Sequence, residues 1–418
     1  MFSGVILMQQ GLILSHKGTG SLAVFIEIFS ALNIQPYIVS SRLMIPEEQF
    51  VELMESNNCK YIIMQEEELS YEQLNETHSL KNFDFCISVW EGQRQLMAEV
   101  NEKIGANDIS ASVIKLIQNK YALRKDLYAA DLTQVKCYDK YSYMKAEPDT
   151  NVIIKPQSGA GALNTRIVNT SSLTKDDFVV EDCISDDLFK EFYKYELFIE
   201  QYISGIEFSF EVLMYDGELL FNCEHEKLES IIKDGFITEN DVCTPTVSVS
   251  DKDLENGTNL IRSMFDRIGV NTGVYHVEMK CADGHWELIE INPRIGGSYI
   301  RQSTMESFGI DLLKEWVLTL LKRKVSGETS RQSGTYFQVY YCDPDHEILS
   351  VKEANGIPSP YLIDKFLKEG DRTPGGKREI FAGQCLWKTE IDSHIDSIKL
   401  LRRDEYLTFD SKKITVLS

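Results

Sequence analysis

Two β-like runs joined by a short polar turn, at residues 273–294, constrain the fold of this chain more than any other feature. The joining residues, Ala-Asp-Gly-His at 282–285, are typical of a β-hairpin turn. A register centred on Gly284, with a three-residue loop, places Glu278 directly opposite Glu290, with their Cβ atoms roughly 5 Å apart. The sequence therefore predicts two antiparallel strands on which two like charges face each other.

The second of these strands carries polar side chains close together at its end. Alternation predicts one face for Leu288, Glu290 and Asn292, and the opposite face for the two intervening isoleucines. Facing carboxylates repel, but a divalent cation between Glu278 and Glu290 would make the arrangement favourable. All-oxygen ligands suit Mg²⁺ or Mn²⁺, and Asn292 would supply a third oxygen. A solvated hairpin with a polar face is the alternative, and the whole set favours the metal.

Arg294 and the pair Gly296-Gly297 come directly after these residues. The guanidinium of an arginine is a rigid fork of donors that suits a carboxylate or a phosphate. The two glycines would let a ligand approach the backbone closely. His276 lies on the same strand face as Glu278, either as a base or supporting group or, more simply, as a structural histidine.

A second polar constellation lies in the sequence IIKPQSGAGA. Lys155 ends an apolar run, and Pro156 breaks the strand. The small residues at 158–162 leave backbone N–H groups accessible to phosphate oxygens, which the neighbouring lysine could help to neutralise. A surface hairpin with a solvated lysine is an equal alternative.

A third constellation is FIEQYISGIEF, residues 198–208. A short connector at 201–203 could present backbone donors and acceptors to the edge of an adenine ring. Glu207 could accept hydrogen bonds from ribose hydroxyls. Taken alone, the segment is better explained as a polar hinge between two strands.

The remaining chain indicates how these segments are arranged. Residues 1–115 alternate short apolar runs with helix-like stretches, which predicts a small doubly wound, Rossmann-like layer. The turn SHKGTGS at 15–21 lacks a complete phosphate-loop motif and is interpreted as an ordinary tight turn. Residues 111–132 have helical spacing, and strands are predicted at 334–342 and 412–418.

Composition excludes several classes of protein. The net charge of −22, from 43 basic and 65 acidic residues, argues against nucleic acid as a main partner. Nine scattered cysteines without a C-x-x-C pair favour a reduced, cytoplasmic setting. The first residues lack the pattern of a signal peptide, and no apolar run is long enough to span a membrane, so no membrane partner is predicted.

In this order, the three constellations resemble the ATP-grasp superfamily of carboxylate–amine ligases. The resemblance covers about residues 105–325 and depends most on IEINPRIGG in register with HVEMK, supported by QNKYALRKDL, VIIKPQSGAG and FIEQYISGIEFSFE. It implies an ATP-grasp fold, of α/β and α+β class, in which two α+β lobes sandwich a nucleotide. The expected domains are a Rossmann-like one at 1–115, a central lobe at 116–200, and a C-terminal lobe with an extension at 201–418.

The resemblance also implies a set of residues that bind ATP. They are Lys120, Lys155, Ser158, Glu200, Gln201, Ile203 and Glu207. The two lysines would contact the α- and β-phosphates, Glu200 and the backbone of the connector would contact adenine, and Glu207 would contact ribose. The loop GAGALNTRIV departs from the Gly-Ser-x-Gly of many family members, so the resemblance does not identify the residues that contact the γ-phosphate.

The same resemblance assigns the chemistry. Glu278, Glu290 and Asn292 would bind two Mg²⁺ (or Mn²⁺) ions. Arg294, with Lys155, would act in catalysis by holding the reacting carboxylate or the acyl phosphate made from it.

The stand-alone architecture is similar to the L-amino-acid ligases within the superfamily. It implies that two L-amino acids are joined through an acyl phosphate, with release of ADP and phosphate. The alternatives are an ATP-grasp ligase with another acceptor, as in peptide extension or nucleotide biosynthesis, and a non-catalytic nucleotide-binding protein. The expected partners are small-molecule amino acids, and the prediction leaves a homodimer open.

Overall fold

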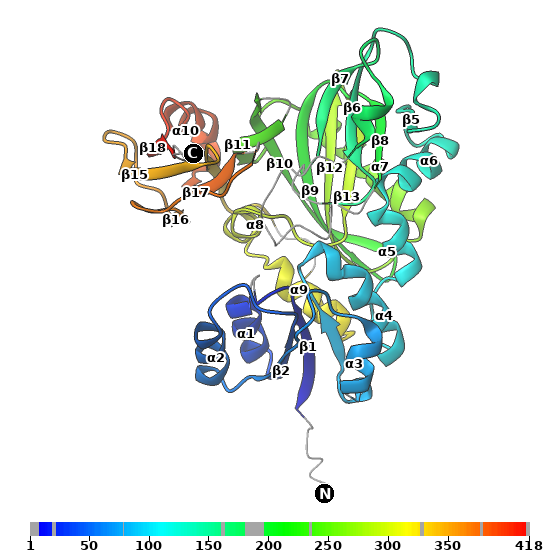
Figure 1. Ribbon diagram of the computed structural model, residues 1–418, viewed down its shortest axis with the longest axis vertical. Helices are drawn as coiled ribbons and strands as arrows, with labels where there is room; N and C mark the ends of the chain where they lie inside the picture. The colour runs from blue at the N-terminus through cyan, green and yellow to red at the C-terminus, as the bar shows by residue number, and fades with distance from the viewer. Residues whose placement is uncertain are drawn as a thin grey trace, which may run out of the picture.

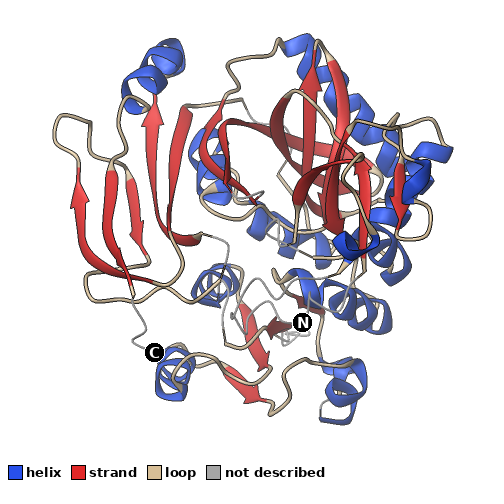
Figure 2. Cartoon of the chain, turned by 45° about the horizontal axis from the view of Figure 1, so that its top comes forward, coloured by secondary structure: helices blue, strands red, loops and turns tan. Residues whose placement is uncertain are grey.

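A computed structural model of the chain describes residues 8–18, 22–77, 79–159, 164–179, 196–233, 236–326, 330–376 and 379–414. Part of the turn at 15–21, part of the small-residue loop at 158–162 and the end of the strand predicted at 412–418 lie outside these residues. The strands form one parallel and three antiparallel sheets (Figure 1, Figure 2).

The N-terminal layer is a parallel sheet with strand order β3-β2-β1-β4. Its elements are β1 (Gln9–Ser15), α1 (Leu22–Ala31), β2 (Ile34–Ser40), α2 (Glu47–Ser56), β3 (Lys60–Ile63), α3 (Tyr71–Thr77), β4 (Phe85–Ile87) and α4 (Arg94–Ile104). This arrangement confirms the predicted Rossmann-like layer. The strand order reverses between β1 and β4, and such a reversal opens a crevice at the carboxyl ends of the two strands.

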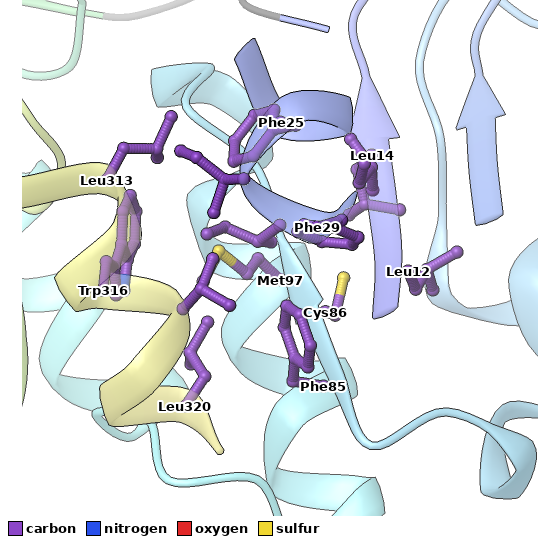
Figure 3. Packing of buried hydrophobic residues seen from close by; sticks show 14 of the residues in the cluster. Leu12, Leu14, Phe25, Phe29, Phe85, Cys86, Met97, Leu313, Trp316 and Leu320 are labelled. Carbon is purple, nitrogen blue, oxygen red and sulfur yellow. The ribbon is translucent and has the colours of Figure 1, made fainter. Parts of the chain in front are cut away.

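The core of this layer includes a helix from much later in the chain. Helix α9 (Leu312–Leu320) packs Trp316 and Leu313 into the same cluster as Phe25, Phe29 and Phe85 (Figure 3). Trp316 and the three phenylalanines are buried, and each removes a large apolar surface from water. The N-terminal layer and the C-terminal half of the chain therefore share one core.

The central lobe consists of two helices and an antiparallel sheet of order β5-β8-β6-β7. Its elements are α5 (Ala111–Gln118), α6 (Lys120–Ala129), β5 (Cys137–Asp139), β6 (Asn151–Pro156), β7 (Arg166–Asn169) and β8 (Leu197–Gln201). The single helix predicted at 111–132 is interrupted, because the side chain of Asn119 accepts a hydrogen bond from the N–H of Ala122 and caps a new helix. The interruption makes Lys120 the first residue of α6.

The C-terminal half contains an antiparallel sheet of order β13-β12-β9-β10-β11-β14-β17-β16. These strands are β9 (Ile206–Tyr215), β10 (Glu218–Lys233), β11 (Phe236–Thr244), β12 (Gly273–Ala282), β13 (His285–Asn292), β14 (Gly334–Cys342), β16 (Leu362–Lys365) and β17 (Ile380–Thr389). The other elements are α7 (Asp251–Ile268), α8 (Ile300–Phe308), α10 (His394–Leu401) and the pair β15 (His346–Glu353) and β18 (Leu407–Lys413). Short 3₁₀ helices lie at Leu80–Asn82, Glu91–Gln93, Tyr143–Lys145, Lys175–Phe178 and Ile391–Ser393. No helix in the described part of the chain has the length and apolar character needed to cross a membrane.

The hairpin β12–β13 has the predicted pairing but a different turn. Ala282 pairs with His285, so the loop has two residues rather than three. A β-bulge at Ile289 then shifts the register by one residue and brings Glu278 opposite Glu290. The two changes in register cancel, and the facing carboxylates are where the sequence predicts them.

The same bulge corrects the predicted faces of β13. Leu288 lies in the core with Trp286 and Ile291, on the opposite face from Glu290. The simple alternation was therefore wrong, because the extra residue reverses which side chains point to the core. The bulge lets an apolar strand end in polar residues without exposing its core side chains.

A buried arginine fastens the N-terminal layer to the end of this hairpin. Arg94, in α4, donates from Nε to the carbonyl oxygen of Pro293 at 3.0 Å. Its two terminal nitrogens donate to both carboxylate oxygens of Asp108, at 3.0 and 2.6 Å. The guanidinium also lies 5.5 Å from the ring centroid of Trp316. The guanidinium of Arg94 therefore joins α4 to Pro293, Asp108 and Trp316, which come together only in the folded protein.

We predict that Arg94→Ala lowers the free energy of unfolding by about 3–5 kcal/mol, because it leaves the carboxylate of Asp108 buried without its partner. Arg42→Ala is the matched control, since Arg42 is exposed and pairs with the exposed Glu67, and it should cost less than about 1 kcal/mol. Urea unfolding followed by circular dichroism measures both. Equal losses in the two variants would contradict the structural role of Arg94.

Candidate active site

The facing carboxylates of the hairpin lie at the centre of a charged cluster. Lys120 Nζ is 3.0 Å from Glu290 Oε2, and Asn292 Nδ2 donates to Glu290 Oε1 at 2.8 Å. Glu278 Oε1 accepts from Lys227 Nζ at 2.9 Å and lies 3.1 Å from His276 Nε2. The repulsion expected between the two carboxylates is thus offset by a protein cation beside each one.

The structure brings the three predicted metal ligands together. Glu278, Glu290 and Asn292 come from facing positions of two paired strands, and Lys120 adds a positive charge from α6. Two carboxylates and an amide offer the oxygen ligands that Mg²⁺ and Mn²⁺ prefer, so the donor set fits such an ion. Their function as metal ligands stays a prediction.

Buried charges in this cluster are held in their ionised forms by their neighbours. Burial alone would lower the pKa of Lys120, but the carboxylates of Glu290 and Glu91 outweigh it, and the pKa is raised. Burial would raise the pKa of Glu278, whereas Lys227 and His276 hold it well below its usual value. Near neutral pH the lysine and the carboxylate are therefore charged.

His276 is also charged near neutral pH. Burial would lower its pKa, but the carboxylates of Glu211 and Glu278 raise it to about 10. One ring nitrogen contacts each carboxylate. An imidazolium held between two acids does not act as a base, so the structure favours the structural alternative that the sequence left open.

The lysine of the phosphate-binding segment is buried. Lys155 Nζ lies 2.6 Å from Glu200 Oε1 and donates to the carbonyl oxygen of Ile289 at 3.3 Å. Only 5% of the residue is exposed, which rules out the alternative of a solvated lysine on a surface hairpin. The small-residue loop contacts α6, where Lys120 Nζ donates a hydrogen bond to Gly159 O at 2.6 Å. Ser158 Oγ donates to the carbonyl of Gln118 at 2.7 Å.

Glu200 gains a role that the sequence did not show. Besides Lys155, its carboxylate accepts a hydrogen bond from Arg124 Nε at 3.0 Å. Burial would raise the pKa of Glu200, but these two cations lower it. Arg124 also donates to the carbonyl oxygen of Leu288, at the bulge in β13. Glu200 therefore positions Lys155, and its predicted contact with adenine stays a prediction.

The connector after β8 is held in place by its backbone. Gln201 donates its N–H to Lys136 O at 3.0 Å and accepts at its side chain from Lys136 N at 2.8 Å. A Cβ at Gly205 would lie 2.3 Å from the carbonyl oxygen of Cys281, so only glycine fits this turn. Ile203 is buried, and its backbone has no hydrogen bond to another described residue. The contact of this backbone with adenine stays a prediction.

Glu207 faces Lys227, a third lysine of the site, which the sequence did not indicate. Lys227, in β10, donates to Glu207 at 2.6 Å, to Glu239 at 2.5 Å and to Glu278 at 2.9 Å. Glu239, in β11, was also missed. Both residues lie on strands that pair with each other, but the pairing includes register shifts that the sequence does not reveal.

Arg294 is joined to the N-terminal layer by another missed residue. Its Nε donates to Glu91 at 2.7 Å, and Nη1 donates to the carbonyl of Ile295 at 2.9 Å. Within the described part of the chain, Nη2 has no partner. Glu91 follows β4 at the carboxyl end of the parallel sheet, a position that by itself could have marked it as a site residue.

The two glycines after Arg294 have different roles. A Cβ at Gly296 would lie 2.6 Å from Ile300 Cγ2 and 2.8 Å from His276 Nδ1, whereas a Cβ at Gly297 would meet nothing within 4 Å. The N–H of Gly296 donates to Glu211 at 3.1 Å. Gly296 is therefore required for packing, and a close approach of a ligand at Gly297 stays a prediction.

Comparison with known proteins identifies the central segment. Residues 148–302 match the ATP-grasp domain family. Carnosine synthase 1 of Homo sapiens is 26% identical over 251 residues, which cover 55% of this chain and 30% of that protein. Carnosine synthase 1 of Mus musculus is 30% identical over 117 residues, covering 28% of this chain and 14% of that protein. The chain spans less than a third of the length of these relatives.

Solved structures share the fold over nearly the whole chain. An L-amino acid ligase from Bacillus licheniformis superposes with a TM-score of 0.74 at 16% identity, covering 96% of this chain and 98% of that one. A phosphoribosylglycinamide synthetase from Anaerococcus prevotii superposes with a TM-score of 0.64 at 15% identity, covering 96% and 99%. The predicted ATP-grasp fold is confirmed.

We predict that Gly296→Ala destabilises the protein by about 1–3 kcal/mol, because the new methyl group must displace Ile300 or the His276 ring. Gly297→Ala adds the same methyl group in open space, and should change the free energy of unfolding by no more than about 0.5 kcal/mol. Chemical denaturation of the two variants tests this. If both behave alike, the packing role of Gly296 is wrong.

Proposed function

We propose that this protein, which carries an ATP-grasp domain, is an ATP-dependent carboxylate–amine ligase that joins two L-amino acids and releases ADP and phosphate. The observation that carries the proposal is the grouping of cations around the end of strand β13, which carries Glu290 opposite Glu278. Lys120 pairs with Glu290, Lys155 donates to the carbonyl oxygen of the preceding Ile289, and Arg294 follows the strand. Cations close to an oxygen-ligand pair suit a polyphosphate with its divalent ions.

The first step transfers the γ-phosphoryl group of ATP to a substrate carboxylate. Lys120 and Lys155 would hold the phosphates, and the backbone of Ile203 and the carboxylate of Glu207 would hold adenine and ribose. Mg²⁺ or Mn²⁺, which we propose binds as two ions at Glu278, Glu290 and Asn292, supplies neutralisation of charge on the phosphoryl oxygens. These residues contribute chiefly by positioning and by electrostatic stabilisation.

Arg294 would hold the reacting carboxylate. Its Nε and Nη1 are fixed by Glu91 and by the carbonyl of Ile295, so Nη2 could bind a ligand without further ordering of the side chain. The carboxylate oxygen attacks the γ-phosphorus, and the bond from that phosphorus to the bridging oxygen of ADP breaks. An amine then attacks the acyl phosphate through a tetrahedral intermediate, and phosphate leaves.

The choice of amino acids as substrates is supported by the relatives. The names of the curated relatives and of the superposed structure from Bacillus licheniformis both denote enzymes that join amino acids. The second candidate is an ATP-grasp ligase with a different acceptor, which the likeness to phosphoribosylglycinamide synthetase keeps open. A non-catalytic nucleotide-binding protein is less well supported, because such a protein would need neither both carboxylates nor Arg294.

The experiment that tests the function is a screen of amino-acid pairs for ATP-dependent phosphate release, with mass spectrometry of the products. We expect a dipeptide, ADP and phosphate from at least one pair. AMP and pyrophosphate as the main products would contradict the acyl-phosphate mechanism. ADP and phosphate that form only with another acceptor would favour the second candidate.

We predict that Glu290→Gln lowers turnover by several orders of magnitude, because the substitution removes one charge from the metal-binding pair and keeps its shape. The fold should remain intact, since Lys120 keeps its hydrogen bond to Gly159 O. Asp283→Asn, at the hairpin turn of the same two strands, is the control and should turn over at the wild-type rate. Steady-state kinetics measures the loss of turnover, and circular dichroism shows whether the fold is retained. A Glu290→Gln enzyme with wild-type turnover would contradict the role of Glu290 as a metal ligand.

A further inference from the structure

The ammonium group of Lys227 sits in a cage of three carboxylates. Its Nζ lies 2.6 Å from Glu207, 2.5 Å from Glu239 and 2.9 Å from Glu278, so each of its three hydrogens has an acceptor. The acceptors come from three different strands, β9, β11 and β12. Only 3% of the lysine side chain is exposed. This is a fully coordinated internal cation.

The cage has the dimensions and charge of a site for a divalent cation. One oxygen from each carboxylate lies within 4.8 Å of the other two, and the lysine nitrogen occupies the space among them. Three carboxylates and one ammonium leave two negative charges in the cage, and the imidazolium of His276 beside Glu278 offsets part of them. A small divalent ion would be attracted there, but the ion and the ammonium cannot occupy one position.

We propose that Lys227 is an internal counter-ion that blocks binding of a divalent cation at Glu278 until a polyphosphate draws the ammonium out of the cage. The inference rests on the proposed nucleotide site. A single ammonium then controls two predicted functions, because it binds both the metal-ligand candidate Glu278 and the ribose-contact candidate Glu207.

The reason is the cost of moving a buried charge. An ion that enters alone must expel the ammonium, and the expelled lysine leaves three strong hydrogen bonds without receiving new acceptors. A triphosphate offers oxygens to the lysine while it brings the ion, so both exchanges occur together. By thermodynamic linkage, the nucleotide then strengthens binding of the ion by the same factor as the ion strengthens binding of the nucleotide.

A second lysine nearby provides a matched control. Lys280 lies 3.8 Å from Glu207 and contacts the ring of Tyr202, but it is outside the cage. Its removal subtracts the same charge from the neighbourhood as removal of Lys227. A general change in electrostatic attraction would therefore strengthen binding of the cation in both variants. Release of a blocked site would strengthen it only in the variant that lacks Lys227.

The test measures Mn²⁺ binding to the ligand-free protein by the electron paramagnetic resonance signal of free Mn²⁺. The wild type should bind weakly, Lys227→Met should bind at least about tenfold more tightly, and Lys280→Met should resemble the wild type. Adding Glu239→Gln to Lys227→Met should abolish the gain, which locates the ion in the cage, because Glu239 belongs to the cage and not to the set of Glu278, Glu290 and Asn292. Tight Mn²⁺ binding by the wild type, or equal gains in the two lysine variants, would overturn the proposal.

The Lys227→Met variant leaves three carboxylates without a cation, so its folding must be followed as well. If it is unstable in metal-free buffer, Mn²⁺ should raise its melting temperature far more than that of the wild type. A variant that stays unfolded with and without Mn²⁺ would count against the proposal. None of these measurements uses substrate or turnover, so failure of the ligase assay and failure of this proposal are distinguishable.

Discussion

One extra residue in strand β13 determines how the site is assembled. The bulge at Ile289 turns Glu290 to the face that carries Glu278, while the apolar residues before and after it stay in the core. It also interrupts the ladder, so that the carbonyl oxygens of Leu288 and Ile289 accept hydrogen bonds from Arg124 and Lys155 of the central lobe. The position of the carboxylates and the attachment of the second lobe thus have the same cause. With the two-residue loop that the hairpin has, a regular strand would not place Glu290 opposite Glu278.

The cations of the site are paired before any ligand arrives. Lys120 pairs with Glu290, Lys155 with Glu200, and Lys227 with three carboxylates. Such pairing keeps buried charges from facing an apolar surrounding alone, which would cost several kilocalories per mole for each. It also means that a ligand exchanges one set of ion pairs for another rather than filling an empty pocket. The selectivity of the site for a charged ligand then depends on how well that ligand replaces the carboxylates.

Local patterns in the sequence predicted much of this arrangement, and non-local contacts account for what they missed. The facing of Glu278 and Glu290 followed from two β-like runs and a turn, although the loop is shorter than expected and a bulge restores the register. The break before Lys120 was missed because good helix formers surround the capping residue. Lys227 and Glu91 were missed because each is defined by partners far away in sequence, on other strands or in another layer.

Helix α9 gives the N-terminal layer an unusual dependence on chain order. The layer is synthesised well before helix α9, yet the aromatic cluster around Phe25 and Phe29 is completed by Trp316 (Figure 3). Until that helix has left the ribosome, the apolar faces of the early helices lack their final partner and stay accessible to other chains. The layer therefore cannot finish folding until the later helix α9 has been made. During synthesis this protein passes through a long period in which its largest core is open on one side.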